Sequence, residues 1–367
     1  MEENSIQRDP PRRWRPSPEF WVVLAILGAF LFGLPGLFVQ PAEQVLFNPQ
    51  VYKQTLDELD AYERFPLIVG EAVAGGGNRL LGGLGDRLRS LLVRANYEAA
   101  LGQIFPKSWI KAQAESLIDQ FFAYFNFESE ELNLVVDFRP VRARLSGEET
   151  AQVSATIVQG LPACNQDDLL RFGLSALTGQ TEGLPLCRPP QQLEGIAHLL
   201  VQVILQGAGQ TLPERMDLMD TLRIPLAVTG GRVDSAWERW FGVYRFYRQT
   251  GPWLPWIALL MVAMAGVLAR RTTRGPLFWM GWALVLPGAS ALLIALILGL
   301  GSSQIVPLVI GGLLGEDVFI FDLLVDVLSR VSSRFVLEVA WMSLAVATLG
   351  ALLILAWGWT RRRGALT

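Results

Sequence analysis

Four uninterrupted apolar runs mark the chain, one near the N-terminus and three toward the C-terminal end. They cover residues 20–39, 253–269, 277–300 and 335–359. Each run has the length, about 17–25 residues, that an α-helix needs to cross the roughly 30 Å hydrocarbon core of a bilayer. Tryptophans at the ends of the later runs, such as Trp253 and Trp256, are typical of the aromatic belt at a membrane–water interface. The pattern predicts four transmembrane helices.

The first run also resembles the apolar core of a cleaved signal peptide. Such cores have about 7–15 residues and end at a cleavage site of the small-x-small type. The run here is longer, and both Leu34-Pro35-Gly36 and Gln40-Pro41-Ala42 lack the first small residue. We therefore expect an uncleaved membrane anchor.

Arginines flank the predicted spans unequally. The positive-inside rule assigns the short segments richest in Lys and Arg to the cytoplasm. It predicts a cytoplasmic tail at residues 1–19, a cytoplasmic loop at 270–276 and a cytoplasmic tail at 360–367. Residues 40–252 and 301–334 are then outside a cell (plasma) membrane. The ten arginines that carry this prediction are Arg8, Arg12, Arg13, Arg15, Arg270, Arg271, Arg274, Arg361, Arg362 and Arg363.

The outer domain, residues 40–252, shows mostly helical periodicity. Asn48-Pro49 predicts a helix start, with Asn48 as N-cap and proline in the first turn. The other predicted helices are residues 79–94 with a leucine stripe; one capped by Ser108 with Ile110, Ala114, Leu117, Ile118, Phe121 and Phe125 facing inward; residues 193–206 with Ile196, Leu200, Val203 and Ile204 facing inward; and one starting at Asp234 or Ser235.

Two stretches alternate with period two, as strands do. They are residues 132–139 and 222–229, and Pro225 would confine the second to a sheet edge. The predicted fold class is a mainly α membrane protein: four transmembrane helices plus a mostly helical extracytoplasmic domain with a minor β element. Within the loop at 301–334, residues 316–333 predict an amphipathic helix that leads into the fourth span.

The spans contain rows of small residues at four-residue spacing, which let helix backbones approach closely. They indicate packing faces, within one chain or between copies. The rows are Ala25/Ala29/Gly33, Ala291/Ala295/Gly299 and Ser343/Ala347/Ala351.

Composition narrows the function classes. Charged residues are 18% of the chain, the net charge is −3, and this gives no basic field for nucleic acid. Lysine occurs at positions 53, 107 and 111 alone, which we interpret as a compositional bias toward arginine. Two cysteines and one histidine are too few for a zinc site of the usual kind. We expect no catalytic residues, cofactor or metal, and a protein that is not an enzyme.

The remaining candidates for chemistry each have a plainer interpretation. The glycines at 75–85 lack the Gly-Lys-Ser/Thr of a phosphate loop. Arg139, Arg142 and Arg144 would suit an anionic ligand or salt bridges to the domain's many acids. Acidic pairs such as Asp167/Asp168 suit a cation site or a solvated surface, and His198 suits a solvated surface.

Cys164 and Cys187 predict a disulfide. Both cysteines of the chain fall in the outer domain, and the predicted topology places that domain in an oxidising compartment. The prolines and glycines around and between them allow the chain to fold back.

The leading hypothesis is a membrane protein whose outer domain binds a partner or ligand, with the spans as a packed anchor. Its partners are then the lipid bilayer and either a second protein or another copy bound through the small-residue faces, with no nucleic acid. The alternatives are a component of a transporter or channel, which usually needs charged groups inside the spans, and a membrane enzyme with an extracytoplasmic site.

Overall fold

The computed structural model describes residues 17–65, 102–130, 132–171, 187–218, 235–314 and 321–364. The predicted helix at 79–94, the glycines at 75–85 and the predicted strand at 222–229 lie outside these residues. The chain forms two compact units, with α15 divided between them after Ser302 and α16 before Ser332. Each unit is described by itself.

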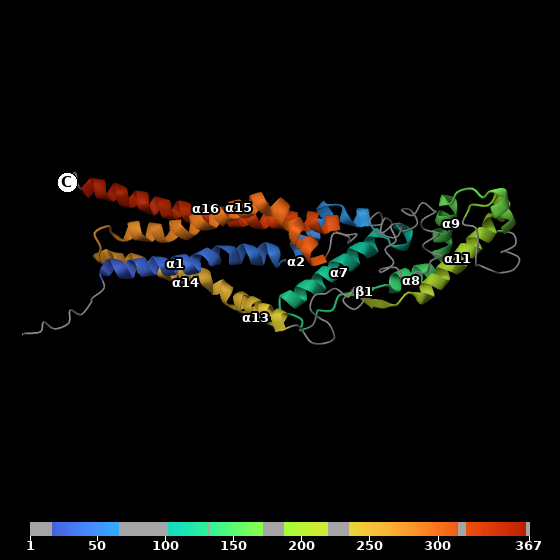
Figure 1. Ribbon diagram of the computed structural model, residues 1–367, viewed down its shortest axis with the longest axis horizontal. Coiled ribbons are helices and arrows are strands. Elements are labelled where there is room, and N and C mark those ends of the chain that lie inside the picture. Colours follow the sequence, from blue (N-terminus) through green and yellow to red (C-terminus); the bar gives the residue numbers. More distant parts are fainter. Residues whose placement is uncertain are drawn as a thin grey trace, which may run out of the picture. The chain divides into compact units, whose positions relative to one another are not determined.

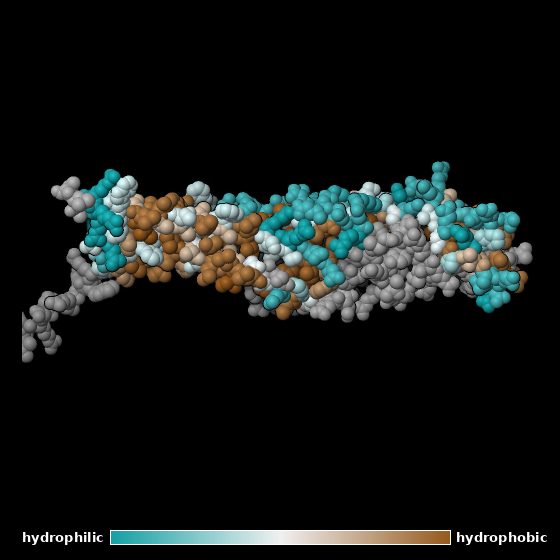
Figure 2. Space-filling model, turned by 90° about the horizontal axis from the view of Figure 1, so that it is seen from above, coloured by the Kyte–Doolittle hydropathy of each residue, from teal (hydrophilic) through white to brown (hydrophobic). Residues whose placement is uncertain are grey.

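The first unit is a bundle of long helices (Figure 1). Four helical runs among the described residues are long and apolar enough to cross a membrane, as predicted: residues 18–46, 242–271, 276–301 and 321–363. Hydrophobic surface covers these helices in a broad band (Figure 2). The elements are α1 (Pro18–Pro41), η1 (Ala42–Leu46), α13 (Ser235–Thr250), η3 (Gly251–Trp253), α14 (Leu254–Leu268), η4 (Ala269–Arg271), α15 (Pro276–Leu314) and α16 (Phe321–Gly364).

Helices α1 and α14 pack closely along their length, because small residues bring the two backbones together. A β-carbon placed on Gly36 would lie 3.2 Å from the backbone nitrogen of Pro255, and one on Gly33 would lie 3.6 Å from Ala258 Cβ. Ala25 and Ala29 of the predicted small-residue row are buried in the same core. Gly33 lies beside Ala258, whereas Gly36, which comes later in α1, lies beside Pro255, which comes earlier in α14. The two helices are therefore antiparallel.

Helices α15 and α16 approach even more closely. A β-carbon on Gly288 would lie 2.8 Å from the backbone nitrogen of Ala347, and one on Gly281 would lie 2.7 Å from the carbonyl oxygen of Gly350. Ser343 and Ala347 are therefore at the interface as the sequence predicts, whereas Ala351 is exposed and Gly350 takes its place. The small-residue rows are used for packing within this chain.

Helices α15 and α16 are longer than the predicted spans of 277–300 and 335–359. Helix α15 continues to Leu314, and α16 begins at Phe321 and runs without a break into the span. The described part of the predicted amphipathic helix at 316–333 is thus the first part of α16 and not a separate element. Nothing between Phe321 and Phe335 ends a helix, since this stretch has neither proline nor glycine.

A π-helix, η1, follows Pro41 at the end of α1. Proline has no backbone N–H to donate to the preceding turn, and a wider turn restores the hydrogen bonding after it. Glu43 of this turn pairs with Arg248 of α13, whose side chain is 14% exposed. Gly251, which follows α13, leaves room for the side chain of Val39. A β-carbon on Gly251 would lie 3.2 Å from that side chain. Gly251-Pro252 forms a 3₁₀ turn, so the helical path from α13 into α14 is continuous.

The second unit is mainly helical with one small antiparallel sheet. It also holds the stretches Ser303–Leu314 of α15 and Phe321–Val331 of α16. Its other elements are α2 (Pro49–Glu58), α7 (Lys107–Phe125), β1 (Val135–Asp137), α8 (Arg139–Ser146), α9 (Thr150–Gly160), η2 (Gln191–Leu193), α11 (Glu194–Thr211) and β2 (Arg215–Asp217).

The helix starts in this unit follow partly from the sequence. Asn48 caps α2 as predicted, since its side-chain oxygen accepts a hydrogen bond of 3.0 Å from the backbone N–H of Gln50. The predicted cap at Ser108 is wrong, because α7 begins at Lys107 with Pro106 in the cap position, and Ser108 lies inside the helix. The face of α7 also differs: Phe122 is buried against Tyr52 while Phe121 is 37% exposed.

The two-stranded element is confirmed, but its second strand is not the predicted one. Val136 of β1 pairs with Met216 of β2 in an antiparallel register. The other edge of β1 is bonded to side chains of α7. Gln120 accepts from the N–H of Val135 at 2.8 Å, Gln113 accepts from the N–H of Asp137 at 2.9 Å, and Trp109 Nε1 donates to the Asp137 carbonyl at 3.0 Å.

Candidate partner-binding surface

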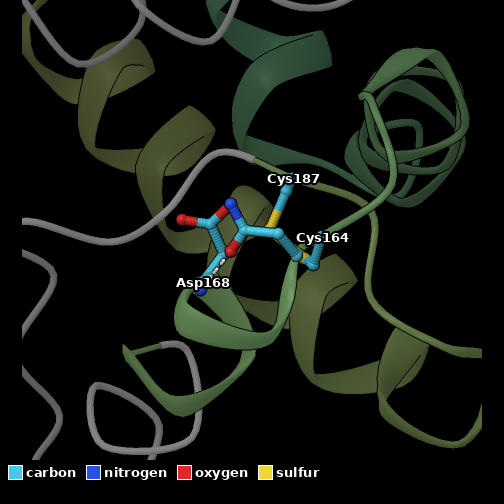
Figure 3. The surroundings of a disulfide bond; sticks show 4 residues. Cys164, Asp168 and Cys187 are labelled. Carbon is cyan, nitrogen blue, oxygen red and sulfur yellow. Dashed lines mark hydrogen bonds between the residues drawn. A yellow bond between two sulfur atoms is a disulfide. The ribbon is translucent and has the colours of Figure 1, made fainter.

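The disulfide joins Cys164 and Cys187, with a Cα–Cα distance of 4.8 Å (Figure 3). This confirms the predicted pair, and the distance lies within the range that a disulfide spans. Backbone hydrogen bonds bring the two residues together. The N–H of Cys164 donates to the carbonyl oxygen of Arg188 at 3.0 Å, and the N–H of Arg188 donates to the carbonyl oxygen of Pro162 at 2.7 Å. Asn165 then starts the short helical segment 166–171, accepting from the N–H of Asp168 at 2.7 Å.

The two cysteines flank the segment that connects α9 to η2 and α11. Helices α8, α9 and α11 share one hydrophobic core, with Val141, Leu145, Ile157 and Leu205 completely buried. Burying such aliphatic side chains contributes about 1.5–3 kcal/mol each relative to an exposed position. The disulfide therefore closes a loop between two helices that already pack against each other.

Helix α11 turns a different face to this core than its sequence predicts. The buried residues are Ala197, Val201, Leu205 and Ala208, while Leu200 and Ile204 pack at the margin. The prediction of inward-facing Ile196 and Val203 is wrong. The reason lies in the sequence itself, because α11 has apolar residues on both sides and its periodicity does not single out one face.

The opposite side of α11 carries an exposed apolar surface. Ile196, Leu199 and Val203 are 38%, 62% and 57% exposed, and their spacing of three and four residues puts them on one face of the helix. We call these three residues the α11 surface. The helix has one acid, Glu194, and no lysine or arginine. A helix that is apolar on two faces is typically covered on both.

Each of the three arginines that suited an anionic ligand lies beside a carboxylate of the same chain. Arg139 Nε lies 2.9 Å from an Asp137 oxygen, Arg142 lies 3.2 Å from Glu214, and Arg144 lies 3.1 Å from Glu149. The hydrogen bonds from Arg139 hold the pKa of Asp137 down at about 2, well below its usual value of 3.8. Of the two interpretations, the structure supports salt bridges.

All three lysines of the chain lie in two helices, α2 and α7. Lys53 lies 2.7 Å from Asp119, Lys111 lies 2.8 Å from Asp57, and Lys107 pairs with Glu63. We call these pairs the lysine ladder. The hydrogen bond to Asp57 raises the pKa of Lys111 above its usual value. Each lysine of the chain thus lies beside a carboxylate.

Tyr62 lies beside this ladder and is 3% exposed, with Lys111 Nζ 5.5 Å from the centre of its ring. Burial raises its pKa to about 12, and the charges of Asp57 and Glu115 act in the same direction. The carboxylates Asp57 and Glu63 are thus engaged with lysines, and Glu58 lies 3.8 Å from Arg330. Within the described residues, no group of three or more His, Cys, Asp or Glu is arranged to hold a metal ion.

His198, the single histidine, is not fully solvated as expected. The side chain is half-buried on α11, and its Nδ1 is buried with no hydrogen-bond partner among the described residues. The buried Nδ1 indicates that this side of the imidazole packs against the protein.

No family model, no curated protein and no solved structure matches the chain. Function must therefore be inferred from the surfaces of the molecule.

Proposed function

We propose that the chain is a multi-pass membrane protein that holds its disulfide-bonded helical domain outside the plasma membrane and binds a partner protein there. The α11 surface is the observation that carries this proposal. It lies on a helix whose other face packs in the core shared with α8 and α9. The Cys164–Cys187 disulfide closes the connection between α9 and α11 beside that core. Three adjacent apolar side chains in water are expected to have a cover in the working protein.

The orientation is supported by the charge distribution and by the disulfide. The arginines at 270–274 and 361–363 flank the ends of three spans, and the positive-inside rule assigns that end to the cytoplasm. A disulfide persists in the oxidising compartment on the other side. Both arguments support an outside location for residues 40–252.

The spans favour an anchor over a transport path. Among the described span residues, Ser343 is the buried polar side chain, and Glu338 near the end of the span is exposed. A solute or proton pathway usually needs ionisable groups that face the interior of the bundle. The proposed role of the spans is therefore to hold the outer domain at the membrane.

The orientation is tested with reporters in the full chain. A fluorescent protein at either terminus or inserted after Thr273 should fold in the cytoplasm, whereas alkaline phosphatase inserted after Glu148, on the exposed turn between α8 and α9, should be active. An active phosphatase after Thr273 would overturn the four-span orientation.

Partner binding is tested by placing a photo-crosslinking amino acid at Leu199 in living cells. We expect a defined protein adduct, and expect its yield to fall sharply when Val203→Glu is added. Losing one central interface residue typically costs about 2 kcal/mol, which weakens binding about 30-fold. The matched control is the same crosslinker at Gln152, exposed on α9. No protein adduct at Leu199, or equal adducts at both positions, would refute the α11 surface as the binding site.

A further inference from the structure

Six arginines gather at one end of the span bundle, at the ends of α14 and α16 and the start of α15. All six are exposed, and we call them the arginine cap: Arg270, Arg271, Arg274, Arg361, Arg362 and Arg363. The end of the bundle where α16 stops is correspondingly hydrophilic, next to the hydrophobic band (Figure 2). Among the described residues none of the six has an ion-pair partner. Glu19, near the start of α1, is exposed and forms no ion pair with them.

Several arginines elsewhere in the described chain have an acidic partner. Arg139, Arg142, Arg144, Arg248 and Arg330 each lie beside a carboxylate. The chain thus has acids to pair with arginine and places none of its described acids against the cap. Six unpaired cations repel one another, and an external anion would relieve that repulsion.

Aromatic rings hold several of these guanidinium groups in place. Arg363 lies 4.4 Å and Arg361 5.5 Å from the ring centres of Trp359 and Trp357. Arg274 lies 5.3 Å from Phe278, whose ring in turn packs 4.9 Å from Trp357. A guanidinium stacked on a ring keeps its N–H groups free at the edge, where they can bind phosphate bidentately.

The turn before α15 is shaped to bring these rings together. Gly275 has a φ of +78°, a conformation that favours glycine, and a β-carbon there would lie 3.6 Å from Trp357. Helix dipoles explain only part of the cap. They attract cations at the C-terminal ends of α14 and α16, but Arg274 precedes the N-terminal end of α15, where a dipole repels them.

We propose that the arginine cap binds the phosphate groups of anionic phospholipids in the leaflet that surrounds this end of the bundle. The rings of Trp357 and Trp359 are interfacial in kind and belong to a span helix, so the guanidinium groups stacked on them lie at headgroup depth. Clustered arginines next to a span are attracted to anionic lipid, with roughly a fivefold gain in affinity per residue. The inference does not depend on the α11 surface or on its partner.

The experiment titrates the purified full-length protein in a non-ionic detergent with phosphatidylglycerol or phosphatidylcholine and counts bound lipids by native mass spectrometry. We expect the protein to retain phosphatidylglycerol in preference, and expect R361Q/R362Q/R363Q to lower its association constant on the order of 100-fold. Arg274→Gln alone should lower it by about fivefold. Added salt should weaken the wild-type preference, a measurement that needs no variant.

Two matched triple variants separate the proposal from simpler effects. R361K/R362K/R363K keeps the charge and loses the stacked planar group, so it should retain part of the preference. R139Q/R142Q/R144Q removes the same charge from the second unit and should leave the preference unchanged. Equal retention of both lipids by the wild type, or an unchanged preference in both R361Q/R362Q/R363Q and Arg274→Gln, would overturn the proposal. So would displacement of the lipid by inorganic phosphate at matched concentration, which would show a site for free phosphate.

Discussion

Asp137 is bonded through both its side chain and its backbone. Its Oδ1 accepts from the backbone N–H of Arg139 at 3.0 Å, in the first turn of α8, and its carboxylate pairs with the Arg139 guanidinium. Its own N–H and C=O groups bond to Gln113 and Trp109 of α7. One residue thereby fixes the end of β1, the start of α8 and the position of α7.

The lowered pKa of Asp137 gives a prediction about acid. Because the folded-state pKa is about 2 and the usual value is 3.8, the stability from its charge is fully present above pH 4 and is lost as the pH falls through 2. Asp137→Ala should cost about 1 kcal/mol near neutral pH, the usual effect of removing a helix-end acceptor. Asp137→Asn, which keeps the acceptor and loses the charge, should cost less. Melting temperatures measured across this pH range test this: the gap between wild type and Asp137→Asn should close on acidification, and a constant gap would contradict it.

The disulfide gives a second prediction at this scale. The cysteines are 23 positions apart, and closing a loop of this size in the unfolded chain contributes roughly 3 kcal/mol. The double variant Cys164→Ser/Cys187→Ser should therefore unfold at lower denaturant concentration than wild type by about that free energy. Adding a reductant should lower the stability of the wild type and leave the variant unchanged. Two free thiols found by alkylation under denaturing, non-reducing conditions would rule out the bridge.

Several residue-level predictions with a local cause succeeded, although the Ser108 cap did not, and partners that are distant in sequence were missed. The Asn48 cap, Pro49 and the cysteine pair depend on neighbouring residues or on a count. The acid that pairs with Arg142 is Glu214, 72 positions away. Nothing in the local pattern singles out that acid from the others in the domain.

At the scale of elements, hydrophobic periodicity located α2, α7, α11 and α13 but missed α8 and α9, and it assigned helix faces less well. Helix α11 is apolar on both sides, so its buried face was misassigned until its packing against α8 and α9 was known. Strand β2 has only three residues, Arg215–Asp217, which are too few for an alternating pattern to stand out. The side-chain bonding of β1 by Gln113 and Gln120 could not be foreseen, because glutamines on a helix are ordinarily solvated.

The close approach of α15 and α16 predicts a sharp difference between two glycines of the same helix. A β-carbon on Gly350 would lie 2.7 Å from the Gly281 carbonyl oxygen, whereas one on Gly358 would meet nothing within 4 Å. Gly350→Ala should therefore lower the stability of the span bundle by about 1–3 kcal/mol through overpacking. Gly358→Ala should leave it unchanged or raise it slightly, since alanine favours helix. Thermal unfolding in detergent measures both, and equal melting temperatures would contradict the packing of these helices.

At the scale of the whole molecule, the number and approximate bounds of the spans followed from the sequence, because a bilayer imposes a length and an apolar composition on any helix that crosses it. The division into two units did not follow, since single helices such as α15 and α16 contribute residues to both. The apolar pattern of residues 277–300 marks where a helix can meet lipid and does not mark where it ends.

The lysine ladder also determines where a lysine-specific protease can cut the chain. Its three sites fall in or beside α2 and α7, so complete digestion leaves fragments 1–53, 54–107, 108–111 and 112–367. Lys53 and Lys111 lie within helices, and Lys107 begins one, so cleavage of the native protein should be slow unless the two helices separate. Asp119→Asn, which removes the carboxylate beside Lys53, should speed cleavage at Lys53, whereas Asp168→Asn in the segment 166–171 should not. Brief digestion and mass spectrometry thus report on one helix pair in a protein of 367 residues, without any label.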